Sequence, residues 1–391
     1  MKDYETIGFG TQEECFSFFK KQKESDIWKR CFISEMSVKP LPNCPIMVSQ
    51  IMSDLDITGI DNSSVIDAME DKRLALTLPL EKLTTRPIRY TAFKTLCERA
   101  GLSGSALSCY SEKPRQKEME PENKAAVLNY GLECFNGSKA LVLIRDEKVS
   151  AVLSGDGKDY SPLPVYDLAK ALETGLTDTF HNVKFVNSHV NHELACITFT
   201  ITDEDVKDLM LATLNKCGHE EDSVIINITL ITSDVGASGA NLFPEIICEG
   251  KAIAVGDEIV LPHKHGHNID DFKLNVGKVY SCLQDGCEKM EALNKIVLKN
   301  PLGCFKAVAF KLGLPKNEAI EAAEFFDAVR PPVTTALDLY WNMWDIIPLY
   351  EKSCKEADKE FGLVKKMNLK ENISRIMNMD IKRFDEPFEW L

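Results

Sequence analysis

The stretch Leu141-Val142-Leu143-Ile144-Arg145-Asp146-Glu147-Lys148-Val149-Ser150-Ala151-Val152-Leu153 decides the fold class of this chain. Two apolar runs flank four charged residues, a composition typical of two antiparallel strands joined by a tight turn. The runs 183–186 and 195–201 flank the polar residues 187–192 in the same way. Two successive hairpins favour an antiparallel sheet, so we predict an α+β protein with a central antiparallel β-rich core.

Helical patterns lie on both sides of this β-region. Thr11 and Glu14 form a capping-box pattern at the start of one helix. From Val276 onward the apolar spacing becomes helical, and residues 334–350 carry a strong apolar stripe. The patterns predict three regions: an N-terminal mixed α/β accessory segment over 1–82, the β-rich core domain with inserted helices over 83–275, and a helical C-terminal region over 276–391.

The composition is that of a globular protein, with 44% hydrophobic and 27% charged residues. No apolar run approaches the ~20 residues of a membrane-spanning helix, and the acidic N-terminus lacks the apolar segment of a signal peptide. The thirteen cysteines are scattered without a C-x-x-C pair. This scatter predicts reduced thiols rather than disulfides or a cysteine zinc site. We therefore expect a cytoplasmic protein without a membrane partner.

The net charge of −14 is unevenly distributed. Residues 155–275 contain 20 acidic and 8 basic side chains, a net −12, whereas residues 82–117 contain 8 basic and 2 acidic side chains, a net +6. Phosphate contacts dominate the affinity of proteins for nucleic acids, so this basic island is the candidate DNA-binding surface. A solvated helical face is the alternative. The candidate phosphate-binding residues are Arg86, Arg89, Lys94, Arg99, Lys113, Arg115 and Lys117.

A helix-turn-helix pattern lies within the basic island. Residues 93–107 pair two short helical segments, and Gly101 would supply the tight turn between them. The second segment offers Ser105 and Ser108 but no Arg, Lys, Asn or Gln to read base edges. A helical hairpin packed within a larger core is therefore the alternative interpretation.

Three of the seven histidines fall within the segment Pro262-His263-Lys264-His265-Gly266-His267. Alternate residues of an extended segment share one face, so His263, His265 and His267 would present three imidazoles together. Neutral imidazoles bind divalent metals, so a divalent metal is the candidate cofactor. A polar surface turn is the alternative, because Pro262 and Gly266 disfavour a strand.

A glycine loop, Ser233-Asp234-Val235-Gly236-Ala237-Ser238-Gly239, precedes the histidine segment. Its glycines and serines are compatible with a nest of backbone amides that binds an anion. The loop has no Walker lysine, which favours a plain turn. No G-x-S-x-G elbow and no dinucleotide-binding fingerprint occur in the chain.

Several of these segments also resemble, in order, the phage/plasmid-like proteins of domain-of-unknown-function family 932. The similar segments are Leu96-Cys97-Glu98-Arg99-Ala100-Gly101-Leu102, residues 143–154 with 160–164, Ser233-Asp234-Val235-Gly236 with Pro244 and residues 248–250, and residues 335–350. The resemblance implies a home on phages, plasmids or integrated elements, but no activity. The histidine–glycine step of the family corresponds to His265-Gly266, so the resemblance does not imply a metal triad.

Three functional hypotheses follow from these observations. The first is a non-enzymatic mobile-element protein that assists DNA transactions or interacts with the host. The second is a metal-dependent hydrolase that uses the histidine cluster. The third is a protein-binding inhibitor of a host factor, because the acidic region suits a basic partner surface.

Overall fold

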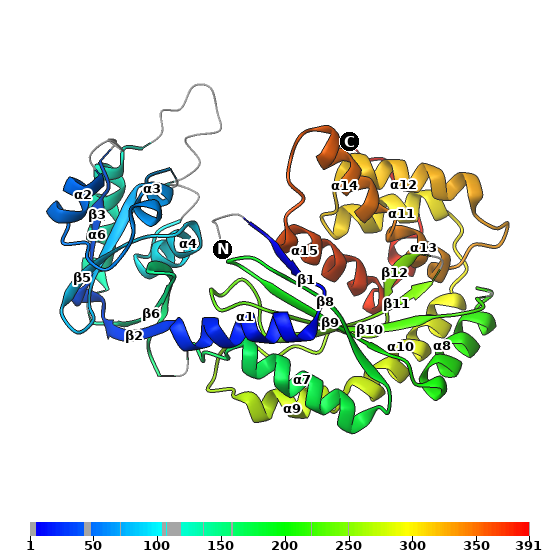
Figure 1. The fold of residues 1–391 in the computed structure, drawn as a ribbon. Coiled ribbons are helices and arrows are strands. Elements are labelled where there is room, and N and C mark those ends of the chain that lie inside the picture. Colours follow the sequence, from blue (N-terminus) through cyan, green and yellow to red (C-terminus); the bar gives the residue numbers. More distant parts are fainter. Residues whose placement is uncertain are drawn as a thin grey trace.

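The computed structural model describes residues 5–42, 48–70, 72–103, 107, 119–135, 137–157, 159–219, 221–248 and 250–390. These residues form an α+β protein with antiparallel sheets and a helical C-terminal region, as the sequence predicts. Two lobes lie side by side in Figure 1. We call residues 27–157 the small lobe, at the left of that view, and residues 5–26 together with 159–390 the main lobe.

The main lobe is built on a six-stranded antiparallel sheet in the order β1-β8-β9-β10-β11-β12. Alternate residues of its central strands are apolar and fully buried, as in Ile197 and Phe199 opposite Leu230 and Ile228. Because side chains alternate across a strand, these residues give the sheet one continuous apolar face. The strands are β1 (Ile7–Phe9), β8 (Val183–Val190), β9 (Ala195–Ile201), β10 (Ile225–Thr232), β11 (Asn241–Cys248) and β12 (Lys251–Ala254).

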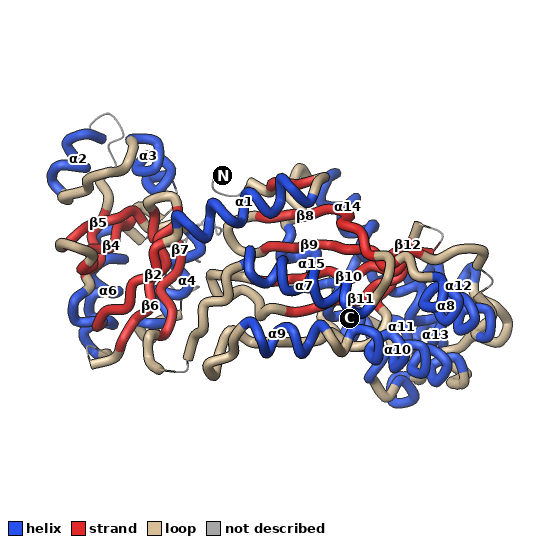
Figure 2. Tube along the Cα trace, turned by 60° about the horizontal axis from the view of Figure 1, so that its bottom comes forward, coloured by secondary structure: helices blue, strands red, loops and turns tan. Residues whose placement is uncertain are grey.

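Helices pack on this sheet, as the tube in Figure 2 shows. Helix α7 packs against β8, β9 and β10, and Leu168, Leu172 and Leu176 on its buried face are completely inaccessible. Helices α1 and α9 lie beside α7, while α15 packs against β12 and forms the ion pair Lys370–Glu245 with β11. These helices are α1 (Gln12–Ser25), α7 (Val165–Thr179), α9 (Ile269–Val276) and α15 (Leu363–Ser374).

The remaining helices of the main lobe form its C-terminal part. Pro301 occupies the first turn of α11, where a missing N–H costs nothing. Thr335 and Asp338 form the capping box of α13. The predicted stripe over 334–350 is divided, because α13 ends at Met343 and α14 begins at Ile346. These helices are α8 (Glu204–Lys216), α10 (Val279–Asn294), α11 (Pro301–Lys311), α12 (Lys316–Val329), α13 (Ala336–Met343) and α14 (Ile346–Glu356).

The small lobe contains two three-stranded antiparallel sheets, β2-β6-β7 and β3-β4-β5. A parallel bridge between Ile88 and Val149 connects them. Helices α4 and α6 cover the shared apolar core, and α2 packs on α3 at one end. The elements are β2 (Ile27–Phe32), β3 (Ser37–Pro40), α2 (Val48–Asp54), α3 (Asn62–Glu70), β4 (Leu74–Pro79), β5 (Leu83–Pro87), α4 (Tyr90–Arg99), α6 (Pro121–Cys134), β6 (Lys139–Arg145) and β7 (Lys148–Ser154).

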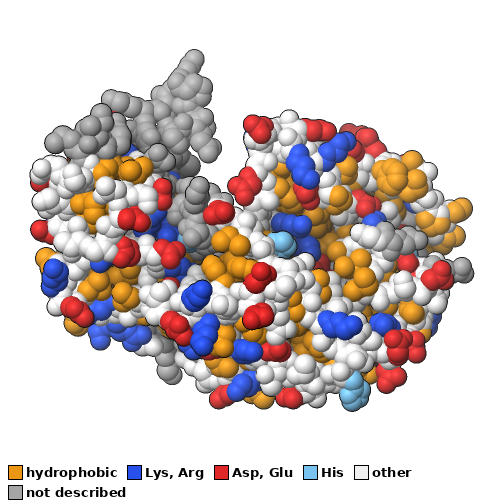
Figure 3. Space-filling model, in the orientation of Figure 1, with side chains coloured by type: hydrophobic (Ala, Val, Ile, Leu, Met, Phe, Trp, Pro, Cys, Tyr) orange, Lys and Arg blue, Asp and Glu red, His pale blue; other side chains and the backbone are white. Residues whose placement is uncertain are grey.

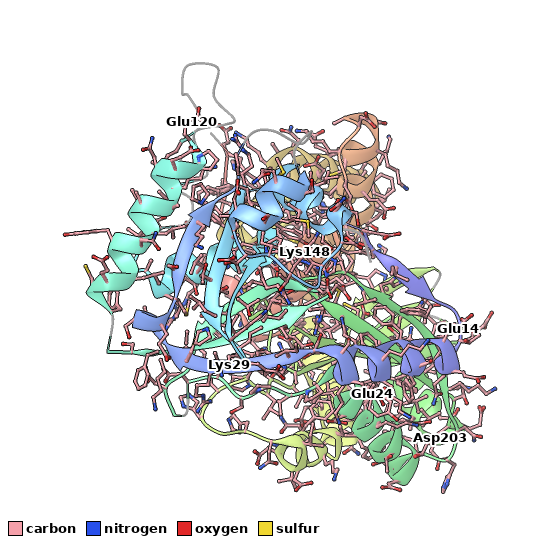
Figure 4. The ribbon with its side chains drawn as sticks, turned by 60° about the vertical axis from the view of Figure 1, so that its left-hand side comes forward. Glu14, Glu24, Lys29, Glu120, Lys148 and Asp203 are labelled. Carbon is pink, nitrogen blue, oxygen red and sulfur yellow. The ribbon has the colours of Figure 1, made fainter. Side chains whose placement is uncertain are left out.

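Both predicted hairpins are confirmed, as β6–β7 and β8–β9. The order of the lobes along the chain was not predicted. The chain begins in the main lobe, where β1 pairs with β8, and crosses to the small lobe where α1 runs into β2. Figure 4 follows this crossing from Glu14 through Glu24 to Lys29.

The predicted region boundaries fall inside secondary structure. The boundary at 82/83 lies in the β4–β5 hairpin, where Pro79 pairs with Leu83, and the boundary at 275/276 lies within α9. Composition alone does not show which lobe a segment joins, because that depends on strand pairings between distant residues.

Two predictions about the environment of the chain can be compared with the structure. Among the described residues, no helix has both the length and the apolar character to cross a membrane. The cysteines in the described ranges are free thiols, and nearly all of them are buried. Burial raises the pKa of Cys15 and Cys97 to about 11, so these thiols are protonated and unreactive at neutral pH.

Candidate functional site

A cavity of about 710 Å³ lies at the junction of the two lobes. The small lobe contributes α4 and the end of β7, and the main lobe contributes the 235–239 loop and the 262–265 turn. Figure 3 shows the molecule hollowed between the lobes, at the top of the view. We call this space the interlobe cavity. Its volume is within the range of about 300–1,000 Å³ that is usual for ligand sites.

Helix α4 presents basic side chains to the interlobe cavity. The Thr91 hydroxyl donates to Ser150 O at 2.7 Å, and Thr95 Oγ1 accepts from Val152 N at 2.9 Å, which fixes the helix on β7. Lys94 and Arg99 line the cavity. Because the Thr91 and Thr95 hydroxyl groups attach α4 to β7, the two cations on this helix have a fixed place in the cavity wall.

Lys264, on the main lobe, adds a third cation to the wall. Across the described ranges, the structure contains no ion pair that involves Lys94, Arg99 or Lys264. By contrast, the buried Arg89 and Arg145 each have acidic partners. These three, which we call the cavity cations, therefore keep their charge available for a ligand.

The glycine loop forms the opposite wall of the interlobe cavity. Ser233 Oγ accepts hydrogen bonds from the amides of Val235 at 3.2 Å and Ala237 at 3.0 Å, which curls the backbone around its side chain. Gly236 has a φ of +84°, a value that favours glycine. A side chain at Gly239 would collide with Leu261 O at 2.7 Å.

Two successive amides of the loop are left without acceptors. Within the described residues, the N–H groups of Ser238 and Gly239 make no hydrogen bond. Successive unpaired amides in a glycine loop are the arrangement that binds anions in backbone nests. The loop therefore adds neutral donors to the positive charge of the cavity cations.

A buried ion network beside the cavity holds the glycine loop of the main lobe to the small lobe. Arg145, at the end of β6, donates to Asp26, which caps the end of α1 (Nη2–Oδ2, 2.5 Å), and to Asp234 in the glycine loop (Nη2–Oδ2, 2.7 Å). Burial raises the pKa of Asp26, and the hydrogen bond and charge of Arg145 oppose that rise. We call Arg145, Asp26 and Asp234 the junction network. It fixes the glycine loop against the small lobe.

An aromatic column lies next to this network. The Tyr160 ring stacks on Trp28 with centroids 6.0 Å apart, and on His263 with centroids 5.4 Å apart and planes within 9°. The Tyr160 hydroxyl donates to Ser233 O at 3.2 Å, and burial raises its pKa well above the ordinary value. The column joins β2 of the small lobe to two loops of the main lobe.

The predicted histidine triad does not form. His263 is buried, and its ring nitrogens lie 3.1 Å from Thr232 Oγ1 and 3.2 Å from Ser161 O. His265 is exposed with a φ of +61°, so the segment turns instead of extending. His267 Nδ1 lies 3.4 Å from Asp271 at the start of α9. In the described ranges, no three His, Cys, Asp or Glu side chains are grouped to hold a metal ion.

The predicted basic island is divided among different environments. Lys94 and Arg99 line the interlobe cavity, whereas Arg86 lines a separate cavity of the small lobe and donates to Thr58 O at 2.5 Å. Arg89 is 1% exposed and contacts the His192 ring and Asp146, so its interpretation as a phosphate ligand is wrong. The remaining candidates, Lys113, Arg115 and Lys117, lie outside the described residues.

The first helix of the predicted helix-turn-helix is α4, and Gly101 follows it with the expected positive φ of 67°. Most of the second segment lies outside the described residues. The sequence did not indicate three residues of the site, namely Lys264, Arg145 and Glu193. Glu193 lines the cavity, and burial raises its pKa while the charge of Lys94 lowers it.

Comparison with known proteins finds no match: no family model, no curated protein and no solved structure matches the chain. The resemblance to the phage/plasmid-like family therefore stays a prediction, and the site is interpreted from its own geometry.

Proposed function

We propose that this protein binds a segment of single-stranded nucleic acid, with one or more phosphates in the interlobe cavity. The observation that carries the proposal is the set of cavity cations, Lys94, Arg99 and Lys264, which lack ion pairs within the described chain and line the same cavity as the glycine loop with its unpaired amides. Lysine and arginine side chains and backbone amides are the usual ligands of phosphate oxygens.

The size of the cavity favours a single strand over a duplex. The interlobe cavity, with about 710 Å³, has the volume of a small-molecule site, whereas a duplex is so large that its major groove alone is ~12 Å wide. A single strand can enter such a space one nucleotide at a time, and a charged groove is the common way to hold it. The resemblance to phage and plasmid proteins agrees with a role in nucleic-acid transactions of a mobile element.

The test is fluorescence anisotropy with a labelled single-stranded oligonucleotide and the matching duplex at about 50 mM salt. We expect the single strand to bind more tightly than the duplex, and the affinity to fall as salt is raised. The charge reversals Lys94→Glu and Lys264→Glu each weaken binding about tenfold or more. Lys359→Glu, an equal charge change in an exposed loop of the main lobe, is the matched control.

Two results would contradict the proposal. One is the absence of any single-strand binding at low salt. The other is binding that the Lys359→Glu control reduces as much as the two cavity variants do, because the effect would then reflect net charge rather than the site.

A further inference from the structure

A second, smaller cavity lies behind the glycine loop. It has a volume of about 190 Å³ and shares Ala237, Ser238 and Gly239 with the interlobe cavity. Its other wall is one face of α15, which contributes Val364, Met367, Asn368 and Glu371 at helical spacing i, i+3, i+4 and i+7. We call this space the α15 cavity.

A buried amide in the α15 cavity lacks a partner for its oxygen. Asn241 is 7% exposed and lines the cavity, and no described residue donates a hydrogen bond to its Oδ1 atom. The Nδ2 group of the same side chain lies 3.5 Å from Ser238 Oγ. A buried acceptor without a donor is costly, so this oxygen is a position where a ligand donor is expected.

Two carboxylates accompany this oxygen. Glu371 lines the α15 cavity. Glu258 lies outside the lining, on the segment that pairs with β11, and a hydrogen bond from the Asn241 side chain lowers its pKa, while its Oε1 atom is buried without a partner in the described chain. The pKa of Glu258 is raised to about 7, mainly by burial and also by the negative charge of Glu371. The raised pKa values of Glu258 and Glu371 show that burial outweighs the compensation that either carboxylate receives.

The protein's own cations do not satisfy this cluster. Arg375 lowers the pKa of both carboxyl groups through its charge, yet the described structure contains no ion pair between Arg375 and either one. Lys370, on the same helix, is already paired with Glu245 at 2.6 Å. The α15 cavity therefore has the carboxyl group of Glu371 and the unpaired amide oxygen of Asn241 in its wall, with the carboxyl group of Glu258 beside them.

We propose that the α15 cavity binds a small primary amine in its ammonium form. An ammonium group has three donors. The carboxylate of Glu371 and the unpaired Oδ1 atom of Asn241 line the cavity as acceptors, and Glu258 lies next to Asn241 outside the lining. The apolar side chains Leu194, Ile231, Val364 and Met367 also line the cavity and suit a short hydrocarbon chain. A divalent metal such as Ca²⁺ would instead require six to eight oxygen ligands. This inference does not depend on the proposed nucleic-acid binding.

The experiment is isothermal titration calorimetry of the full chain with n-butylammonium chloride. We expect one equivalent to bind with a dissociation constant of about 1 mM or lower. The neutral isostere 1-butanol should not bind, and Ca²⁺ should not compete. Glu371→Gln and Glu258→Gln should each weaken butylammonium about tenfold, whereas Glu321→Gln, which removes an exposed charge on α12, should leave it unchanged.

Several outcomes would overturn the proposal. They are the absence of butylammonium binding, equal binding of 1-butanol, displacement of butylammonium by Ca²⁺, and unchanged affinity in both glutamate variants. Circular dichroism and thermal unfolding of each variant confirm that a loss of binding is not a loss of folding. Since no nucleic acid enters the experiment, its result is separate from the test of the interlobe cavity.

Discussion

The junction between the lobes holds two sets of cationic groups with different partners. Arg145 is buried between two carboxylates and connects both lobes, whereas Lys94 and Lys264 line the interlobe cavity without ion pairs among the described residues. A buried charge must be paired or its desolvation is not compensated. A charge at a cavity wall is solvated, so it needs no partner within the protein and is available to bind a ligand. The comparison separates cations that stabilise the fold from cations that are available for binding.

The largest effect is expected from breaking the junction network. Replacing Arg145→Met leaves Asp26 and Asp234 buried without their partner, so the free energy of unfolding should fall by about 3–5 kcal/mol. Urea denaturation measures this change. The control Arg383→Met breaks an exposed pair with Asp380 and should cost less than about 1 kcal/mol. Equal losses in the two variants would refute the structural role of Arg145.

The opposite result is expected for the cavity cations. The neutral variants Lys94→Gln and Lys264→Gln should leave the free energy of unfolding within about 0.5 kcal/mol of the wild type, because neither lysine has an ion pair to lose. The slope of log affinity against log salt for a single strand should become smaller by about 0.7 for each charge removed. A large loss of stability with an unchanged salt dependence would show that these lysines stabilise the fold, as Arg145 does, and do not bind the strand.

The contrast between a buried and an exposed group also applies to His263 and His265. Burial lowers the pKa of His263 below its ordinary value of 6.5, although the charge of Asp234 and the Ser161 carbonyl partly oppose this. The native state then binds a proton less readily than the unfolded state, so stability is lost as the pH falls through about 6.5. His263→Gln should reduce that loss between about pH 7 and pH 5, measured by denaturation. The exposed His265→Gln should keep the wild-type slope.

The smallest effect is expected for Glu193, the carboxylate that lines the interlobe cavity, and it is a change in single-strand affinity. Burial raises the pKa of Glu193, and its negative charge appears as the pH rises through that pKa. A charged carboxylate beside Lys94 opposes an anionic ligand, so Glu193→Gln should tighten single-strand binding about two- to fivefold at high pH, since two charges about 4 Å apart in water interact by about 1 kcal/mol. At low pH, where Glu193 is protonated, the variant and the wild type should bind alike. A gain that does not depend on pH would contradict this assignment.

Local patterns in the sequence predicted much of the fold. The hairpins β6–β7 and β8–β9 and the Thr11 cap of α1 follow from runs of neighbouring residues, and the structure has them. The pairing of β1 with β8 joins residues far apart in the chain, and no local pattern indicates it.

The candidate site was predicted in part. Lys94, Arg99 and the histidine segment were proposed as separate DNA and metal sites, and the structure brings Lys94, Arg99, His263 and His265 to one cavity. The triad failed because positive φ values at His265 and Gly266 turn the backbone. Composition did not distinguish the buried Arg89 from the exposed Lys94, because burial depends on how α4 packs against distant strands.

The stacked contact between Trp28 and Tyr160 gives the junction an optical signal. The chain has four tryptophans, and the other three, Trp341, Trp344 and Trp390, lie in the C-terminal part of the main lobe. A variant with those three replaced by phenylalanine would carry one indole, at the point where the two lobes meet. Its emission would then report the spacing of the lobes directly, without an attached dye.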